Sequence, residues 1–364
     1  MKTREDIISK ALKLEPLSVQ EALLLYTQAP LAELMAVAKI LRERHVPGNN
    51  AGWIIDRNVN ITNICFSQCK FCNFCRRPGD PDTYITGMDD YRLKIAELFE
   101  MGGKQLLLQG GMHPSLGLQY YTGLFRRLKD EFPQLVLHAL GPPEVVHLAK
   151  TEKKSFRYIL EKLVESGMDS LPGAGAEILV DRVRKIVSPA KATAGEWLDV
   201  MEEAHKMNLP TSATMMYGHI ETIEERITHL TRLRDLQKKK PEGHYGFITF
   251  IPWPFQDKGT VLAEKHGVFN KTGLSDHIRI IAISRIVLNN ISNIQSSILT
   301  TGRDTALMTL HAGANDLGSV MIEENVVSAA GSSTMFNAGE LTAVIREAGF
   351  NPVQRNQKYE PAGD

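Results

Sequence analysis

The chain has 364 residues, of which 43% are hydrophobic and 23% are charged, a composition typical of folded globular proteins. Its 42 basic and 42 acidic residues cancel, which argues against broad electrostatic binding to nucleic acid or to an anionic membrane. No apolar run reaches the roughly 18 residues of a membrane-spanning helix, and the charged first residues lack the apolar core of a signal peptide. We therefore predict a folded cytoplasmic protein that binds neither nucleic acid nor membrane.

The hydrophobic pattern alternates between short strands and amphipathic helices. Residues 1–50 are predicted to be helical, with apolar positions at helical spacing from Leu31 to Leu41, and Pro47-Gly48 ends this segment. Strands are then expected at 58–62, 105–108, 135–139, 169–171, 211–215, 247–251, 293–297 and 312–315. Helices are expected between them, from Asp89 or Asp90 to Gly102 and at 120–131, 144–166, 178–187, 196–207, 222–238, 275–288 and 304–310.

Strands that alternate with helices favour a parallel sheet, and eight of them predict a (β/α)8 TIM-type barrel over residues 51–350. Residues 1–50 are then an N-terminal helical extension packed on the barrel, and residues 351–364 are a C-terminal tail. A doubly wound sheet is the alternative, but no Gly-x-Gly-x-x-Gly turn follows a strand. Barrels of this kind place their chemistry in the loops after the C-terminal ends of the strands, so candidate residues are sought there.

All four cysteines, Cys65, Cys69, Cys72 and Cys75, lie close together after the first predicted strand. A disulfide framework would spread its cysteines along the chain, so a metal site is favoured. A structural zinc site usually has a second pair of ligands beyond a longer loop, and this chain has no further cysteine. A ferredoxin spacing fits the last three cysteines but would need a fourth at Gly79. The remaining pattern is C-x3-C-x2-C at Cys65, Cys69 and Cys72.

With the aromatic Phe71 before the third cysteine, this spacing resembles the radical S-adenosylmethionine (SAM) superfamily. The resemblance implies a [4Fe-4S] cluster held by three thiolates, SAM bound at the open iron, and a 5′-deoxyadenosyl radical as the reactive species. It also implies a one-electron reductant such as flavodoxin or ferredoxin. Cys75 is either a small buried residue where an aromatic is common, or an alternative ligand.

Two further strand ends are candidates for holding SAM. Gln109-Gly110-Gly111 closes the second strand and resembles the Gly-Gly loop that holds the SAM amino group in the superfamily, with a plain tight turn as the alternative. Glu177 follows the fourth strand, where it either caps the next helix or, as the resemblance implies, approaches SAM.

Polar residues at other strand ends are candidates for substrate binding and catalysis. His138 ends the third strand and either contacts substrate or is a structural histidine. Tyr217, His219 and Glu221 share one short loop after the fifth strand. Tyr217 would contact substrate, and His219 or Glu221 would serve as the general base, unless Glu221 only caps the next helix.

The loops after the sixth and seventh strands add aromatic and cationic candidates. Trp253 and Phe255 are held by neighbouring prolines, so they either wall off a flat ligand or form a packed loop core. Arg303 offers a fork that matches a substrate carboxylate, and Arg279 is an equal alternative.

Motifs across residues 50–350 resemble one branch of the superfamily, which contains the menaquinone enzymes of the futalosine route and the deazaflavin-forming enzymes. The motifs lie at 60–65, 69–72, 109–114, 215–221, 250–256 and 313–318. The segment at 250–256 looks most like the cyclic dehypoxanthine futalosine synthases, whereas Cys75 and Thr301-Gly302-Arg303 depart from the expected pattern.

The resemblance implies an oxidoreductase of menaquinone biosynthesis with a small-molecule substrate. Its reaction would remove a ribose C4′ hydrogen from dehypoxanthine futalosine, join that carbon to the benzoate ring, and then release an electron and a proton. Aminofutalosine synthase and the deazaflavin-forming enzymes are alternatives within the same branch. A non-enzymatic iron–sulfur electron carrier is a further alternative, although a carrier would not need a barrel of this size.

The cysteine spacing generates a first prediction. Replacing Cys65, Cys69 or Cys72 singly by alanine should abolish [4Fe-4S] binding after anaerobic reconstitution, because each supplies one of three thiolates, whereas Cys75→Ala should retain the cluster. Iron and sulfide content and the visible absorption spectrum measure the outcome. Loss of the cluster in Cys75→Ala together with its retention in Cys65→Ala would favour the ferredoxin-type assignment instead.

Overall fold

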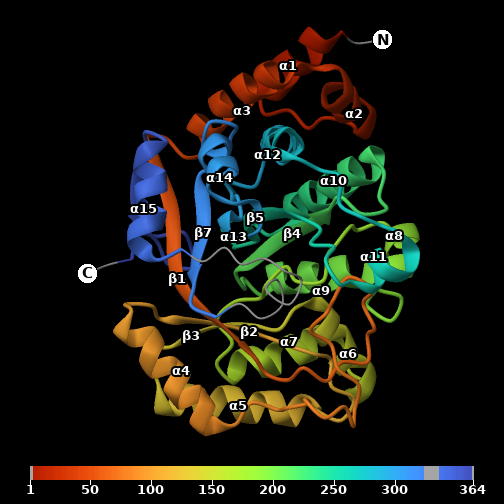
Figure 1. The fold of residues 1–364 in the computed structure, drawn as a ribbon, viewed down its shortest axis with the longest axis vertical. Coiled ribbons are helices and arrows are strands. Elements are labelled where there is room, and N and C mark those ends of the chain that lie inside the picture. Colours follow the sequence, from red (N-terminus) through yellow and green to blue (C-terminus); the bar gives the residue numbers. More distant parts are fainter. Residues whose placement is uncertain (1–2, 324–335, 363–364) are drawn as a thin grey trace.

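The computed structural model describes residues 3–323 and 336–362, and parallel strands form its centre (Figure 1). The strands are β1 (Asn50–Asn60), β2 (Gln105–Gln109), β3 (Val136–Ala139), β4 (Thr211–Tyr217), β5 (Phe247–Pro254), β6 (Asn293–Ile294), β7 (Asp316–Met321) and β8 (Asn351–Gln354). Every pairing between these strands is parallel.

The pairings close into a ring. One sheet runs β3-β2-β1-β7 and the other runs β4-β5-β6. Parallel bridges at Ser170 and Leu171 join β3 to β4, and a bridge between Gln295 and Asp316 joins β6 to β7. The short segment at Ser170-Leu171 therefore takes the place of the fourth strand, and the predicted (β/α)8 barrel is confirmed.

The helices lie around this ring (Figure 1). In α5 the buried residues Tyr121, Leu124, Phe125 and Leu128 recur at the spacing of one helix face. The helices are α1 (Arg4–Leu12), α2 (Val19–Gln28), α3 (Leu31–His45), α4 (Met88–Glu100), α5 (Leu118–Glu131), α6 (Pro142–Glu152), α7 (Phe156–Glu165), α8 (Asp181–Val187), α9 (Ala194–Lys206), α10 (Ile223–Lys239), α11 (Val261–His266), α12 (Leu274–Val287), α13 (Ile298–Thr301), α14 (Arg303–Leu310) and α15 (Ala338–Glu347).

Several predicted boundaries were wrong for physical reasons. The helix expected at 144–166 is two helices, because Lys153 adopts a left-handed conformation that ends α6. The strand expected at 312–315 lies instead at β7, since Gly313 has a φ of +105° and turns the chain just before it. β1 starts at Asn50 rather than at 58, so the polar residues from Asp56 to Asn58 lie inside a strand. The segment predicted as a tail begins with β8, which pairs with β1.

The helices α1, α2 and α3 pack on the outside of the barrel, next to α10 and α12 (Figure 1). Leu34 and Leu41 of α3 are fully buried and belong to the same hydrophobic core as the barrel. Arg42 is 3% exposed and donates hydrogen bonds to the carbonyl oxygens of Ala314, Gly48 and Asn50. This arginine therefore ties α3 to the chain segments that lead into β1 and β7.

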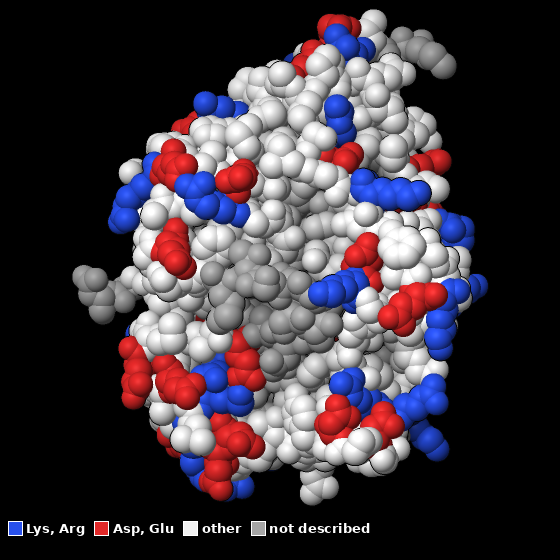
Figure 2. Space-filling view, viewed as in Figure 1, with Lys and Arg blue, Asp and Glu red and all other residues white. Residues whose placement is uncertain are grey.

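The surface mixes both signs of charge. Figure 2 shows acidic and basic side chains side by side around this face, in keeping with a net charge of zero. Among the described residues, no helix combines the length and the apolar character needed to cross a membrane.

The burial of α3 predicts its contribution to stability. Leu34→Ala should lower the free energy of unfolding by about 2–5 kcal/mol, because it leaves a cavity in the shared core. Ile40→Ala is the matched control, since Ile40 lies on the same helix and is 47% exposed. Chemical denaturation followed by circular dichroism measures both variants.

A deletion of residues 1–45 tests the same contact more severely. The apolar sides of α10 and α12 that pack against α2 and α3 would be exposed to water, so the shortened protein should be insoluble or should unfold without a sharp transition. Sharp cooperative unfolding with full activity would contradict this prediction.

Candidate active site

The interior of the barrel contains a cavity of about 370 Å³. Alternate residues of a strand point to opposite faces, so every second residue of each strand faces the interior. On β5 these are Thr249, Ile251 and Trp253, and on β4 they are Ser212 and Thr214. The cavity wall is therefore mixed, with hydroxyl groups beside aliphatic and aromatic side chains.

The cysteine loop follows β1 and forms one end of this cavity. Cys65, Cys69 and Cys72 all line it, together with Phe71. The Ser67 hydroxyl lies 2.9 Å from Cys65 Sγ and 3.4 Å from Cys69 Sγ, which links the first two thiols. Three thiols that face one space are the donor set of a [4Fe-4S] cluster with an open iron, so these residues fit that group.

The thiols lie in different environments. A hydrogen bond with Cys75 lowers the pKa of Cys65 to about 5, whereas burial raises the pKa of Cys69 to about 11. Cys75 also lines the cavity, and its Sγ donates to the Cys65 carbonyl oxygen at 3.1 Å. Cys75 therefore lies beside the other three cysteines. Its substitution tests whether it is a packing residue or a cluster ligand.

The paired glycines after β2 lie directly against the cysteine loop. A Cβ added to Gly111 would lie 2.1 Å from the Ile64 carbonyl oxygen, so only glycine fits there. The Gly111 N–H donates to the Thr62 carbonyl oxygen at 2.7 Å. Gln109, Gly110 and Gly111 all line the cavity, as a cofactor site requires, but the Gly111 N–H is already used to hold the loop.

Glu177 faces the cavity in a buried ion pair. Its carboxylate accepts a hydrogen bond from Lys191 at 2.8 Å, and the Lys191 ammonium lies 5.3 Å from the centre of the Phe71 ring. Burial acts against ionisation, but the charge of Lys191 lowers the pKa of Glu177 below its usual value. Burial raises the pKa of the neighbouring Glu144 to about 7. The cavity thus has a charged cluster beside the cysteine loop.

The opposite end of the cavity is formed by polar residues, several from the C-terminal segment. Arg355, which follows β8, pairs with Asp316 through two hydrogen bonds. His138 lines the cavity here, with its Nδ1 2.7 Å from the Ser170 hydroxyl and its Nε2 3.3 Å from the Gln357 amide nitrogen. Burial lowers the pKa of His138 to about 3, so the ring is neutral.

Comparisons with known proteins agree with this geometry. Residues 59–233 match the sequence profile of the Radical SAM superfamily, and residues 244–363 match that of the CofH/MqnC C-terminal region. The chain is 41% identical over 359 residues to the cyclic dehypoxanthine futalosine synthase of Streptomyces coelicolor, covering 98% of this chain and 88% of the relative. It belongs to the radical SAM superfamily.

Other relatives show the breadth of this branch. The cyclic dehypoxanthine futalosine synthase of Halalkalibacterium halodurans is 38% identical, covering 98% of this chain and 94% of that protein. The 5-amino-6-(D-ribitylamino)uracil–L-tyrosine 4-hydroxyphenyl transferase of Methanococcoides burtonii is also 38% identical, covering 90% of this chain and 91% of that protein.

Solved structures share the fold of this radical SAM protein. Methylornithine synthase superposes with a TM-score of 0.71 at 18% identity, covering 96% of this chain and 98% of the other. The hydrogenase maturase HydG superposes with a TM-score of 0.75 at 16% identity, covering 97% and 77%.

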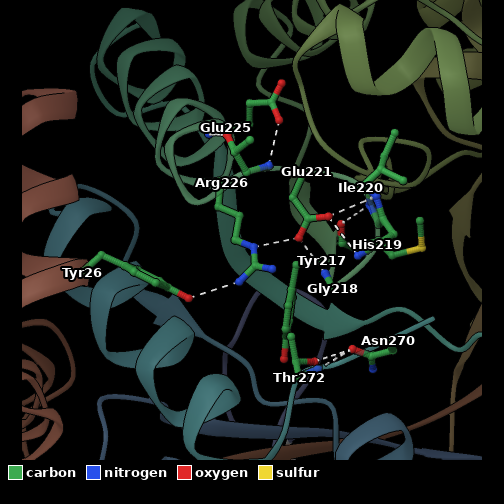
Figure 3. A network of polar contacts seen from close by, with 12 residues as sticks. Tyr26, Tyr217, Gly218, His219, Ile220, Glu221, Glu225, Arg226, Asn270 and Thr272 are labelled. Atoms are coloured by element: carbon green, nitrogen blue, oxygen red, sulfur yellow. Dashed lines mark hydrogen bonds and ion pairs between the residues drawn. The ribbon is translucent and has the colours of Figure 1, made fainter. Parts of the chain in front are cut away.

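The structure does not bring His219 and Glu221 to the cavity. Both side chains are fully buried, and Figure 3 shows them in a polar network behind the end of β4. Glu221 accepts hydrogen bonds from the backbone N–H groups of Gly218 and His219 and from Arg226. Arg226 also donates to the Tyr26 hydroxyl of α2 at 3.1 Å, so the network anchors the N-terminal helices to the barrel.

Three further candidates lie outside the residues that line the cavity. Tyr217 and Phe255 are buried away from it, and the Tyr217 hydroxyl is hydrogen-bonded to His277. Strand alternation explains Tyr217, because Ser212 and Thr214 face inward and an odd-numbered residue of β4 then faces outward. Arg303 is exposed and pairs with Glu347 and Asp304. The alternative, Arg279, donates to backbone oxygens of Tyr26 and Ala29.

Sequence reasoning missed the residues at the far end of the cavity. Asp56 lies within a strand rather than after one, and Arg355, Gln357 and Tyr359 lie in the presumed tail. Because the first strand was predicted to begin at 58, Asp56 fell outside it and gave no signal of facing the interior. Arg303 does not line the cavity, whereas Arg355 does, and its guanidinium is already paired with Asp316.

The buried network behind β4 generates a prediction. Glu221→Ala should lower the free energy of unfolding by about 3–5 kcal/mol, because the largely buried Arg226 guanidinium would lose its carboxylate partner. Glu224→Ala is the matched control, since Glu224 lies three residues away in the first turn of α10 and is exposed. Thermal unfolding measures the effect. A Glu221 variant with wild-type stability but without turnover would show a catalytic role instead.

Proposed function

We propose that this protein cyclises dehypoxanthine futalosine in menaquinone biosynthesis. The observation that carries the proposal is its similarity, over nearly the full length, to two cyclic dehypoxanthine futalosine synthases. The cavity supports it, because it combines three thiols at one end with a long mixed wall that suits a substrate containing a sugar and an aromatic ring. The chain is accordingly an oxidoreductase with a small-molecule substrate.

The residues for the cofactors lie at the cysteine end. Cys65, Cys69 and Cys72 would hold the [4Fe-4S] cluster, and the backbone of Gly110 and the Glu177–Lys191 pair would lie against SAM. When the cluster and SAM are both bound, and the cluster has been reduced by a flavodoxin or ferredoxin, they would supply a carbon-centred radical that abstracts hydrogen from an unactivated carbon.

The protein's own contribution is to orient the substrate and exclude water. The reaction would transfer one hydrogen atom from ribose C4′ to the carbon radical that the cofactors supply, form one carbon–carbon bond to the benzoate ring, and release one proton and one electron, the latter to a one-electron acceptor. The two reacting carbons belong to the same molecule, so holding them in contact has a large effect on the rate. Trp253 and Ile251 of β5 provide an apolar wall against which the aromatic ring would lie.

A second candidate function is that of the 5-amino-6-(D-ribitylamino)uracil–L-tyrosine 4-hydroxyphenyl transferases. Its support is the 38% identity to the protein of Methanococcoides burtonii, which equals that of the second synthase. Aminofutalosine synthase is the third alternative within the branch. All three share the cofactor end of the site, so the substrate wall distinguishes them.

Trp253 provides the test. Trp253→Ala should still cleave SAM but give 5′-deoxyadenosine in excess of cyclised product, because the benzoate ring loses an aromatic contact worth about 0.5–1.5 kcal/mol beyond area burial. Anaerobic turnover with SAM, a reductant and dehypoxanthine futalosine measures both products by chromatography. Phe269→Ala is the matched control, since Phe269 is 55% exposed and lies outside the residues that line the cavity.

Two outcomes would contradict these assignments. Unchanged coupling in Trp253→Ala would remove this residue from the substrate wall. Wild-type enzyme that forms no cyclised product, but couples 5-amino-6-(D-ribitylamino)uracil with tyrosine, would replace the first function by the second.

A further inference from the structure

The end of the cavity remote from the cysteines has no assigned role. Asp56 lies there on β1, four residues before Asn60, which corresponds to roughly 13 Å along a strand. Both residues line the same cavity, so a ligand held near the cysteines can extend down the barrel to Asp56. Asp56 is 6% exposed and lines the cavity, so a ligand in the cavity can reach it.

The carboxylate of Asp56 is held in place from two sides. Its Oδ1 accepts a hydrogen bond from the Ser319 hydroxyl on β7, and its Oδ2 accepts one from the Gln105 amide on β2 at 3.3 Å. A carboxylate offers about four acceptor positions, so roughly two remain after these bonds. The side chain faces the cavity, and we therefore expect the remaining positions to be available to a ligand.

A buried ion pair completes this end. Arg355 is 5% exposed, and its Nη2 donates to Asp316 Oδ1 at 2.9 Å while its Nε donates to Asp316 Oδ2. The guanidinium carbon lies 3.8 Å from the centre of the Tyr359 ring, and the Tyr359 hydroxyl donates to Thr249 at 2.8 Å. A Cβ on Gly52 would lie 2.3 Å from Asp316 Oδ2, so only glycine fits at this position of β1 beside the Arg355–Asp316 pair. These contacts fix the shape of the subsite before any ligand binds.

The charges decide which ligand this end suits. Asp316 neutralises Arg355, which leaves Asp56 as the carboxylate without a cationic partner in direct contact among the described residues. A ligand carboxylate would lie against a like charge and is disfavoured. Vicinal hydroxyl groups fit, since each can donate one hydrogen bond to an oxygen of Asp56.

We propose that Asp56, braced by Ser319 and Gln105 beside the Arg355–Asp316 pair, binds the vicinal hydroxyl groups of a sugar or polyol portion of the substrate. The proposal rests on the proposed function in that the substrate contains such a portion. Asp56 would be a specificity-determining residue that sets how the sugar presents its carbon to the cofactor end. The C-terminal segment, through Arg355 and Tyr359, would position this subsite.

The test compares two ligands on two proteins. The ligands are dehypoxanthine futalosine and its 2′,3′-dideoxy analogue, titrated by anaerobic calorimetry into the reconstituted, SAM-loaded enzyme. In the wild type the analogue should bind about 10- to 100-fold more weakly, as expected for the loss of hydrogen bonds to a charged group. Asp56→Asn should weaken binding of the intact substrate by a similar factor and should abolish the discrimination between the two ligands.

Controls separate this effect from misfolding. Asp304→Asn is the matched variant, because Asp304 is an exposed aspartate outside the residues that line the cavity, and it should keep wild-type discrimination. The thermal transition and the cluster content of Asp56→Asn report folding. If that variant does not fold, the analogue series on the wild type still decides the proposal, since equal binding of both ligands would overturn it.

The outcomes also separate the subsite from the enzyme assignment. Strong substrate binding with unchanged discrimination in Asp56→Asn would overturn the subsite and leave the proposed function standing. A wild type that does not bind dehypoxanthine futalosine would overturn the proposed function. The same comparison with 5-amino-6-(D-ribitylamino)uracil and an analogue without ribityl hydroxyls would then decide the subsite, with loss of discrimination in Asp56→Asn supporting it and unchanged discrimination overturning it.

Discussion

The pairing of β1 with three other strands is the constraint on which the structure depends. Its C-terminal half pairs with β2, its middle pairs with β7, and its first residues pair with β8. This strand therefore joins the start of the barrel to its end. It also places candidate functional residues at two levels of the barrel, because its end leads into the cysteine loop while its middle holds Asp56 inside the cavity.

Three buried ion pairs among the described residues lie in different parts of the barrel, and each performs a different task. Glu177 with Lys191 lies beside the cysteine loop, Arg355 with Asp316 lies at the far end, and Glu221 with Arg226 lies behind β4. Removing one partner of such a pair costs more than the pair contributes, because the other charge stays buried. These pairs therefore contribute more to the local arrangement of the chain around them than to the net free energy of folding. The third pair, through Arg226 and Tyr26, joins the loop of His219 and Glu221 to α2.

The two ends of the cavity are proposed to serve different purposes, one for the cofactors and one for the substrate. The cysteine end lies within the region that matches the Radical SAM superfamily, and it is where the proposed cofactors would bind. The far end is built in part by residues 351–362, within the region that matches the CofH/MqnC profile. Under the proposed function, substrate choice is expected to lie at the far end and at the wall near Trp253, since the cofactors would occupy the cysteine end.

The sequence by itself determined the features that depend on local pattern. The C-x3-C-x2-C spacing, the order of strands and helices and hence the barrel, and the Gly-Gly turn after β2 could all be read from neighbouring residues. Cys65, Cys69, Cys72, Phe71, Gln109, Glu177, His138 and Trp253 accordingly line the cavity.

Only the tertiary structure decided which polar residues face the interior. Tyr217 lies at the end of β4 on the face opposite to Ser212 and Thr214, because the register of the ring sets the inward face of each strand. His219, Glu221 and Phe255 follow the strand ends and lie outside the residues that line the cavity. Arg355 reaches the cavity because β8 pairs with β1, about 300 residues away in sequence. Contacts between segments so far apart leave no periodic signal in the chain, and the partners of Asp56 and Arg355 therefore appear only when the barrel closes.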